Sequence, residues 1–208
     1  MPVLGRTKKD VLQEFRTAEI LEAARRVFAR NGYNETTVDQ IAEEAGVAKG
    51  TVYLYFSSKH DLFCAAMRSG LNDLYERAQL EITAADTTAD RLRAFIGARL
   101  RYCSENRDFF RIYYTEFASL KVRRGASQPE FQDLYDQQLA VLESLLAAGI
   151  RGGEVRATLD TPRAAHLLFE YIRAAVAKHV MEWPDEPIES TLSLVFELLW
   201  RGIACEGK

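Results

Sequence analysis

Apolar residues recur every three or four positions along nearly the whole chain, which is the spacing of amphipathic helices. No segment keeps the strict alternation of apolar and polar residues that marks a half-buried strand. Glycines, prolines and capping residues such as Ser, Thr, Asn and Asp divide the pattern into segments of helical length. We therefore predict an all-α fold of about nine helices.

Between Thr36 and Phe56 the pattern predicts two short helices separated by a tight turn. Gly46 can take the positive φ that ends the first helix, since it has no Cβ to clash. Such a helix, turn and helix is typical of DNA-binding proteins, whose second helix enters the major groove, but a plain helical hairpin fits the same spacing. The first helix has one apolar face, formed by Val38, Ile41, Ala42 and Ala45, and beyond the break Val47 and Val52 supply apolar contacts.

The second of these helices carries side chains that suit nucleic acid. Lys49 and Lys59 supply positive charge, and Gly50 removes bulk where a backbone must approach another surface closely. Thr51, Tyr53 and Tyr55 have hydroxyl groups that can contact phosphate oxygens or base edges. We expect Tyr53 and Tyr55 to contact DNA rather than the core, whereas Phe56, which lacks a polar group, belongs in the core.

Residues from about Thr17 to about Met67 resemble the DNA-binding domain of the tetracycline-repressor (TetR) family. The matching residues include Ile20–Ala24, Val27–Phe28, Asn31–Tyr33, Thr36–Val38, Ile41–Ala42, Ala45–Val47, Lys49–Tyr53, Tyr55–Phe56, Ser58–Lys59 and Asp61–Leu62. So many matches in order make the resemblance specific over these fifty or so residues. The rest of the chain is similar to the family only in length and helical character.

This resemblance implies roles for particular residues. Thr37 would start the second helix and contact phosphate, and Tyr53 and Lys59 would grip the DNA backbone. Base contacts would come from Lys49, Gly50, Thr51, Leu54 and Tyr55. Ala48 departs from the family, because many members have Ser or Thr there to cap the recognition helix, so we expect that cap to be absent.

The remaining sequence predicts a larger helical domain. We place a helix-turn-helix domain with a basic N-terminal arm at 1–60, and an effector-binding and dimerisation domain at 61–208. Beyond Ser58, whose pairing with Asp61 forms a capping-box pattern, the expected helices end near Glu81, Ser104, Leu120, Gly149, Trp183 and Ala204. The starts expected for the later ones are at Asn106, at Ser127 with Pro129 and Glu130, and at Thr161–Pro162, and Arg123–Ala126 is expected to be a loop.

The last two helices carry apolar stripes that suit a homodimer, in which two helical hairpins form a four-helix bundle. The predicted interface residues are Ala164, Leu168, Ile172, Ala175, Leu192, Val195, Phe196 and Leu199. The same stripes could face only the chain's own core. A helix-turn-helix protein usually needs two copies to read two half-sites, and TetR resemblance implies dimerisation through these helices.

The middle of the chain is rich in large aromatic residues, which predicts a pocket for a small hydrophobic or aromatic effector. The candidate lining residues are Phe95, Arg99, Tyr102, Phe110, Tyr113, Phe117, Gln138, Phe169 and Arg173. Any one of these aromatic residues could equally be ordinary core. The resemblance implies that such an effector would release the protein from operator DNA.

Composition narrows the class of protein further. The net charge is −3, with nine basic and eight acidic residues in 1–60, so DNA affinity must depend on where charges lie. Three widely spaced cysteines and an N-terminus without an apolar segment predict a cytoplasmic protein, and no run approaches the roughly 20 apolar residues of a membrane span. The three histidines have no metal-ligand spacing and no catalytic motif is present, so we expect no enzyme, cofactor or metal site.

We therefore predict a homodimeric transcriptional regulator that binds double-stranded operator DNA and a small molecule, most simply a repressor. Two alternatives stay open: a DNA-binding regulator without an effector, and a helical carrier or enzyme whose N-terminal hairpin is incidental. The identity of the effector and the choice between repressor and activator are not legible in the sequence.

Overall fold

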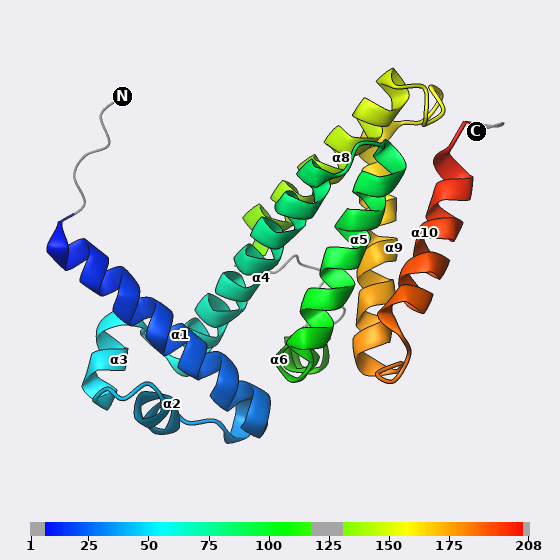
Figure 1. The fold of residues 1–208 in the computed structure, drawn as a ribbon. Coiled ribbons are helices and arrows are strands. Elements are labelled where there is room, and N and C mark those ends of the chain that lie inside the picture. The colour runs from blue at the N-terminus through cyan, green and yellow to red at the C-terminus, as the bar shows by residue number, and fades with distance from the viewer. Residues whose placement is uncertain (1–6, 118–130, 206–208) are drawn as a thin grey trace. The chain divides into compact units, whose positions relative to one another are not determined.

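The computed structural model describes residues 7–117 and 131–205, and every regular element in these ranges is helical (Figure 1). The all-α prediction is confirmed. In the described ranges the elements are α1 (Lys8–Glu35), α2 (Val38–Glu44), α3 (Lys49–Tyr55), α4 (Lys59–Ala84), α5 (Thr88–Glu105), α6 (Arg107–Ile112), a π-helix η1 (Tyr113–Phe117), α8 (Gln132–Arg151), α9 (Thr161–Met181) and α10 (Ile188–Ile203).

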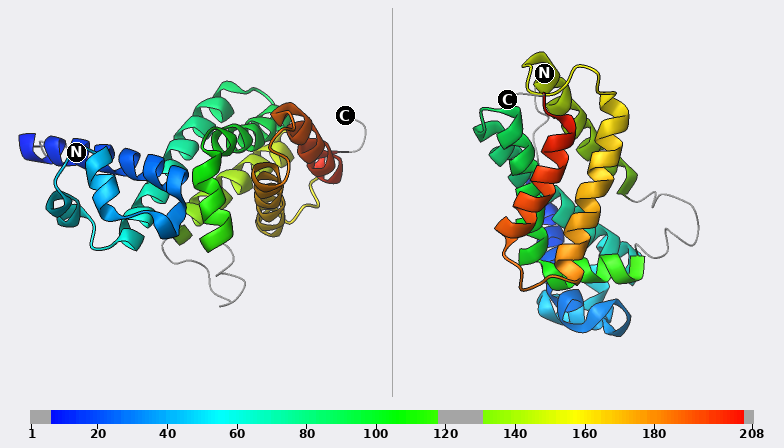
Figure 2. Two further views of the ribbon diagram at one scale, coloured as in Figure 1. Left: turned by 90° about the horizontal axis from the view of Figure 1, so that it is seen from below. Right: turned by 90° about the vertical axis from the view of Figure 1, so that its right-hand side faces the viewer.

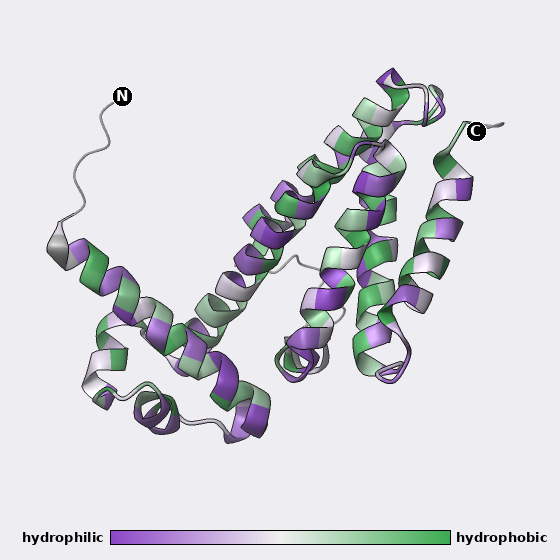
Figure 3. Cartoon of the chain, viewed as in Figure 1, coloured by the Kyte–Doolittle hydropathy of each residue, from purple (hydrophilic) through white to green (hydrophobic). Residues whose placement is uncertain are grey.

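The chain divides into two compact units between Gly70 and Leu71, a point that lies within α4. We call residues 7–70 the head and residues 71–205 the body. Each has its own hydrophobic core. None of the described helices is long and apolar enough to cross a membrane, and their hydropathy varies from residue to residue along each helix (Figure 3).

The head is built on α1, which is kinked at Gly32, where φ is 78°. Phe28 of α1 is buried and packs edge-on against Phe63 of α4, with ring centroids 5.1 Å apart. Helix α2 packs against both α1 and α3. It contributes the buried residues Val38, Ile41 and Ala42, which are three of the four expected on its apolar face; Ala45 is half-buried.

The turn between α2 and α3 follows the prediction. Gly46 has a φ of 65°, the left-handed region that favours glycine. Its N–H donates to the carbonyl of Glu43 at 3.0 Å, and the N–H of Val47 donates to the carbonyl of Ala42 at 2.9 Å. These bonds satisfy carbonyl groups that the end of α2 would otherwise leave without partners.

The body is organised around α5, which packs against α8, α9 and α10 (Figure 2). Its first turn is fixed by a residue far away in sequence, because the carboxylate oxygens of Glu154 accept from the N–H of Thr88 at 3.0 and 3.1 Å. Near the same place an isolated antiparallel bridge joins Val155 to Ala204. The start of α5 and the end of α10 are thereby tied to the loop that follows α8.

Several helix boundaries differ from the sequence prediction. The side chain of Asn106 donates to the carbonyl of Tyr102 at 2.9 Å and does not cap α6, which gives way to η1 after Ile112. The carboxylate of Asp61 accepts from Ser57, so only the Ser58 half of the predicted capping box forms. The loop and helix start expected within 123–130 lie outside the described residues.

Gly149 offers a test of the packing in the body. A Cβ placed there would lie 2.6 Å from Cγ2 of Val155 and 2.7 Å from Cγ2 of Thr88. We expect Gly149→Ala to lower the free energy of unfolding by about 1–3 kcal/mol, as overpacking usually does. Gly202→Ala is the matched control, since a Cβ there meets nothing within 4 Å. Urea titrations followed by circular dichroism compare the two; equal stability of both variants would contradict the packing described here.

Candidate nucleic-acid interface and effector site

Helix α3 has seven residues and is held in the head by two side chains, because Val52 is 1% exposed and Phe56, which follows the helix, is also buried. So short a helix is not stable in water by itself, so packing must maintain it. Phe56 therefore belongs to the core, as predicted. The packed side of α3 is narrow, which leaves most of its surface open.

The open side of α3 carries the residues predicted to read DNA. Leu54 is 83% exposed and Tyr53 is 48% exposed, while Thr51 and Tyr55 are half-buried. Ala48 is the N-cap and makes no side-chain hydrogen bond, so the predicted loss of this cap is confirmed. These residues therefore share one short, accessible helix, and their contacts with DNA stay a prediction.

Neither the packing of the described residues nor the backbone conformation requires a glycine at position 50. A Cβ placed on it meets nothing within 4 Å, and its backbone is helical without a positive φ. Because glycine weakens a helix relative to alanine, its presence here costs about 0.5–1 kcal/mol. This agrees with the expectation that Gly50 lets an external surface approach closely.

Lys49 is paired within the free protein. Its Nζ lies 2.7 Å from Oδ2 of Asp39, and this hydrogen bond raises the pKa of Lys49. Both side chains are more than half exposed, and exposed pairs of this kind contribute little to stability. A phosphate group can therefore replace Asp39. Nothing in the spacing of residues 39 and 49 predicts this partner.

Thr37 is the N-cap of α2, and its side chain is exposed. Its Oγ1 accepts from the N–H of Gln40 at 3.3 Å, and the side-chain oxygen of Gln40 accepts from the N–H of Thr37 at 2.9 Å. This reciprocal capping box uses the hydroxyl oxygen as an acceptor. The hydroxyl hydrogen can still donate to a phosphate, as the resemblance implies.

Lys59 differs from its predicted role. Its Nζ donates to the carbonyl oxygens of Tyr33 at 2.9 Å, Asn34 at 3.0 Å and Thr36 at 2.9 Å. An ammonium group has three N–H donors, so these bonds use all of them. The end of α1 exposes carbonyls that need donors, and Lys59 meets that need instead of holding a phosphate. Its charge still lies in the head, but the predicted direct contact with the DNA backbone is not supported.

In the body, a subset of the predicted effector residues meets around Arg99. The guanidinium lies 3.4 Å from the ring centroid of Phe95 and 5.8 Å from that of Phe169, and Nη2 donates to Gln138. The residues around Arg99 come from α5, α8 and α9. Tyr113 of η1 is grouped with Arg173 instead: burial raises the pKa of Tyr113, and the guanidinium of Arg173 opposes that shift.

The other predicted effector residues are placed differently. Tyr102 and Phe110 are buried and form a separate edge-to-face pair with centroids 5.9 Å apart. The ring of Tyr102 also faces Arg77 of α4, at 5.0 Å. The side chain of Phe117 lies outside the described residues.

Half of the predicted dimer residues lie inside the chain's own core. Ile172, Val195, Phe196 and Leu199 are at most 7% exposed in the isolated chain, so their assignment to a dimer interface is wrong. Helical periodicity identified an apolar stripe but could not tell an inward face from an outward one. Ala164, Leu168, Ala175 and Leu192 are half-buried. The large apolar side chains exposed on α9 and α10 are instead Leu167, Leu194 and Leu198, which the sequence analysis missed.

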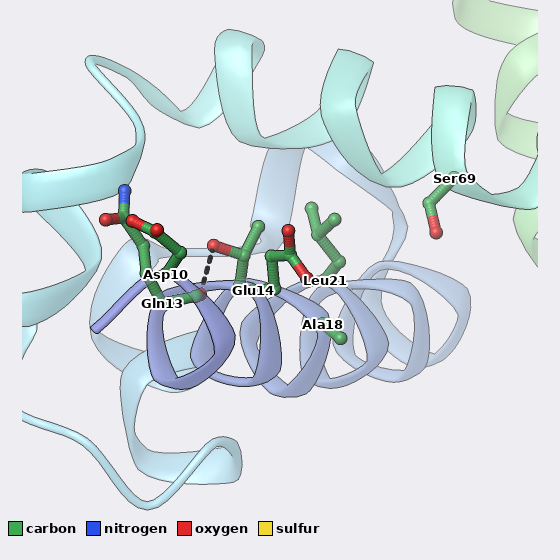
Figure 4. A pocket seen from close by; sticks show the side chains of 7 residues that line it. Asp10, Gln13, Glu14, Ala18, Leu21 and Ser69 are labelled. Atoms are coloured by element: carbon green, nitrogen blue, oxygen red, sulfur yellow. Dashed lines mark hydrogen bonds between the residues drawn. The ribbon is translucent and has the colours of Figure 1, made fainter. Parts of the chain in front are cut away.

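A hollow of about 600 Å³ lies in the head, against α1 and Ser69 of α4 (Figure 4). Its lining is Asp10, Gln13, Glu14, Thr17, Ala18, Leu21 and Ser69. It contains none of the predicted effector residues. Its two carboxylates and its place in the head do not suit an apolar effector.

The described residues contain no metal-binding cluster, and one of the three cysteines has a strongly perturbed thiol. No group of three or more His, Cys, Asp or Glu residues there could hold a metal ion. The three cysteines are free, and burial raises the pKa of the Cys103 thiol to about 12. A thiol so hard to ionise is a poor redox sensor.

Comparison with known proteins agrees with this geometry. Residues 20–66 match the family described as bacterial regulatory proteins, tetR family, and residues 85–179 match a tetracyclin repressor-like C-terminal domain. The fatty acid metabolism regulator protein of Bacillus subtilis is 28% identical over 187 residues, which are 89% of this chain and 94% of that protein. The transcriptional repressor KstR2 of Mycobacterium tuberculosis is 30% identical over 161 residues, 76% of each chain.

A solved structure has a similar fold. The transcriptional regulator FadR from Bacillus subtilis, in complex with stearoyl-CoA, is 28% identical to this chain with a TM-score of 0.75. The match covers 89% of this chain and 98% of that chain.

Lys59→Met tests the structural role of this lysine. The change leaves three carbonyl groups at the end of α1 without their donor, so we expect a loss of roughly 1.5–3 kcal/mol in the free energy of unfolding. Lys49→Met, which removes only an exposed pair, should change stability little. Urea unfolding of both variants gives the comparison. A Lys59→Met protein as stable as the wild type would show that these bonds do not hold the head together.

Proposed function

The chain belongs to the tetR family of bacterial regulatory proteins, and from this premise we propose that it is a homodimeric repressor that a small apolar effector releases from operator DNA. The family consists of DNA-binding transcriptional regulators with a helix-turn-helix. The observation that carries the proposal is the exposure of Leu54, Tyr53 and Gly50 on one short helix, where no packing contact with the described residues requires them. A hairpin that only completed a core would bury such residues.

The head is the DNA-binding part in this proposal. Thr37, Lys49, Gly50, Thr51, Tyr53, Leu54 and Tyr55 are its contact residues. We assigned this role to residues 1–60, and the residues that pack with them extend to Gly70. Operator DNA lies in the cytoplasm, so the protein would act there. The body, assigned as 61–208, would bind the effector and hold the dimer.

The dimer follows from the geometry of operators. Helix-turn-helix proteins read two half-sites about 34–36 Å apart, which needs two copies of α3. Leu194 and Leu198 are 54% and 59% exposed and lie four residues apart on α10, so they share one face. Leu167 of α9 is also exposed. We propose that these leucines, with the half-buried Ala164, Leu168, Ala175 and Leu192, form the interface.

The effector would bind among the aromatic residues of the body, near Phe95, Arg99, Tyr113, Gln138, Phe169 and Arg173. The relatives favour a long-chain acyl compound, because one is a fatty acid metabolism regulator and one is solved with stearoyl-CoA. An effector can release DNA only if it binds the DNA-free conformation more tightly. A regulator without an effector is the remaining alternative, and ligand titration decides it.

A gel shift of the wild-type chain on DNA from the region upstream of its own gene tests the proposal. We expect a complex that specific DNA, but not random DNA, competes away, and transcription from that region should rise when the gene is deleted. Failure to bind any such DNA would favour a carrier or enzyme with an incidental hairpin. A fall in transcription after deletion would indicate an activator.

Gly50→Ala separates folding from DNA binding. Alanine should leave the head as stable as before or stabilise it slightly, since the added Cβ meets nothing in the free chain. It should weaken operator binding by about tenfold, because the methyl group occupies the space where α3 approaches the bases. Fluorescence anisotropy on an operator duplex measures this. Gly202→Ala is the control, with unchanged affinity; equal affinities of the two variants would remove Gly50 from the interface.

Leu198→Arg tests the dimer. The charge would be buried without a partner in the interface, so we expect a monomer by light scattering and a loss of cooperative operator binding. Leu80→Arg, at another exposed leucine of the body (72% exposed, on α4), should stay dimeric. A Leu198→Arg protein that remains a dimer would place the interface elsewhere.

A further inference from the structure

Arg99 is a buried cation without a carboxylate partner among the described residues. Its side chain is 5% exposed, and no other Lys, Arg, Asp or Glu of the described ranges is buried. Its two hydrogen bonds go to neutral acceptors, from Nη1 to the carbonyl of Phe95 and from Nη2 to the side chain of Gln138. Burial lowers the pKa of its guanidinium to about 9, so it is still charged at neutral pH.

Such a group is costly unless something compensates its charge. The face of Phe95, 3.4 Å from the guanidinium carbon, offers a cation–π contact that offsets only part of the desolvation. Arginine has five N–H donors, and the two hydrogen bonds leave three of them for another acceptor. The planar fork of these donors suits a carboxylate or a phosphate in particular.

The neighbouring charges do not supply that acceptor. Glu170 of α9 is exposed and already pairs with Arg173 at 2.8 Å and accepts from the hydroxyl of Tyr135 at 2.9 Å. The thiol of Cys103 is held in its neutral form. Among the described residues the guanidinium contacts the rings of Phe95 and Phe169 and the side-chain amide of Gln138. Arg99 is therefore a positive charge without a compensating negative charge among the described residues, and the aromatic rings of Phe95 and Phe169 lie beside it.

We propose that Arg99 binds the anionic group of the effector, so that the effector is an apolar molecule carrying a carboxylate or a phosphate. This deepens the proposed function and rests on it. Gln138 and Phe95 hold the guanidinium in place, and Phe169 contacts the apolar part. The anion can come from two sources: the carboxylate of a free fatty acid, or the phosphates of its coenzyme A thioester.

Three probes with the same chain length distinguish the sources: dodecanoate, dodecanoyl-CoA and 1-dodecanol. Calorimetry measures their affinities for the wild type, Arg99→Met and Arg93→Met. Arg93 is the matched control, because it lies on the same helix with its guanidinium 4.0 Å from the ring of Phe196, yet its side chain is exposed. We expect Arg99→Met to weaken at least one anionic probe by about a hundredfold or more and to leave 1-dodecanol unchanged. Arg93→Met should behave as the wild type.

Thermal unfolding without ligand separates binding from structure. Removing an uncompensated buried charge should leave the melting temperature of Arg99→Met equal to or above that of the wild type. Arg99→Lys keeps the charge without the fork, so it should fold and retain part of the affinity. A clear drop in the melting temperature of Arg99→Met would show that Arg99 is structural and would overturn the proposal. So would wild-type protein that binds neither anionic probe, or an Arg99→Met protein that binds both as the wild type does.

The same probes test the anionic group of the effector separately from the release of operator DNA. Release of operator DNA by 1-dodecanol, with no dependence on Arg99, would support an apolar effector and overturn the anionic group. Binding of dodecanoate or dodecanoyl-CoA through Arg99, without any effect on operator affinity, would support the site and overturn its role as an inducer.

Discussion

The burial of Val52 and Phe56 is the constraint on which the DNA-binding surface depends. A helix of seven residues does not persist in water, so α3 exists because these two side chains and the turn at Gly46 hold it against the head. Because few side chains of α3 pack against the head, Tyr53 and Leu54 remain exposed. Stability and the proposed recognition therefore use different sides of one short helix, and changes on the open side should affect DNA binding without unfolding the head.

The body applies a different constraint, because α5 is covered on several sides by α8, α9 and α10. Residues 95–100 of α5 are all buried, and a segment so enclosed is expected to be apolar. Arg99 breaks that rule, beside the rings of Phe95 of α5 and Phe169 of α9. Departures from local consistency are expected at functional sites, and this one motivates the assignment of an anion-binding effector site. The buried segment and its charge are the reasons to propose an effector site in the body.

Much of this fold could be predicted from the sequence, and the features that could not be predicted have physical causes. The turn at Gly46, the uncapped start at Ala48 and the helical class follow from local chemistry, which sequence displays directly. The partners of Lys59, the carbonyls of Tyr33, Asn34 and Thr36, could not be predicted, because only the tertiary fold brings them to it. Periodicity marked the stripes of α9 and α10 but not their direction, so Val195 and Leu199 were taken for interface while Leu194 and Leu198 were overlooked.

The central claim is that a ligand bound in the body and DNA bound by the head influence each other. Coupling between two sites is reciprocal, so an effector that weakens operator binding must itself bind more weakly, by the same factor, when operator is present. The most direct test is calorimetric titration of dodecanoyl-CoA into the wild-type protein with and without saturating operator duplex. This account predicts a lower affinity in the presence of operator, matched by an equal loss of operator affinity at saturating ligand. Ligand affinity that is unchanged by operator would contradict it.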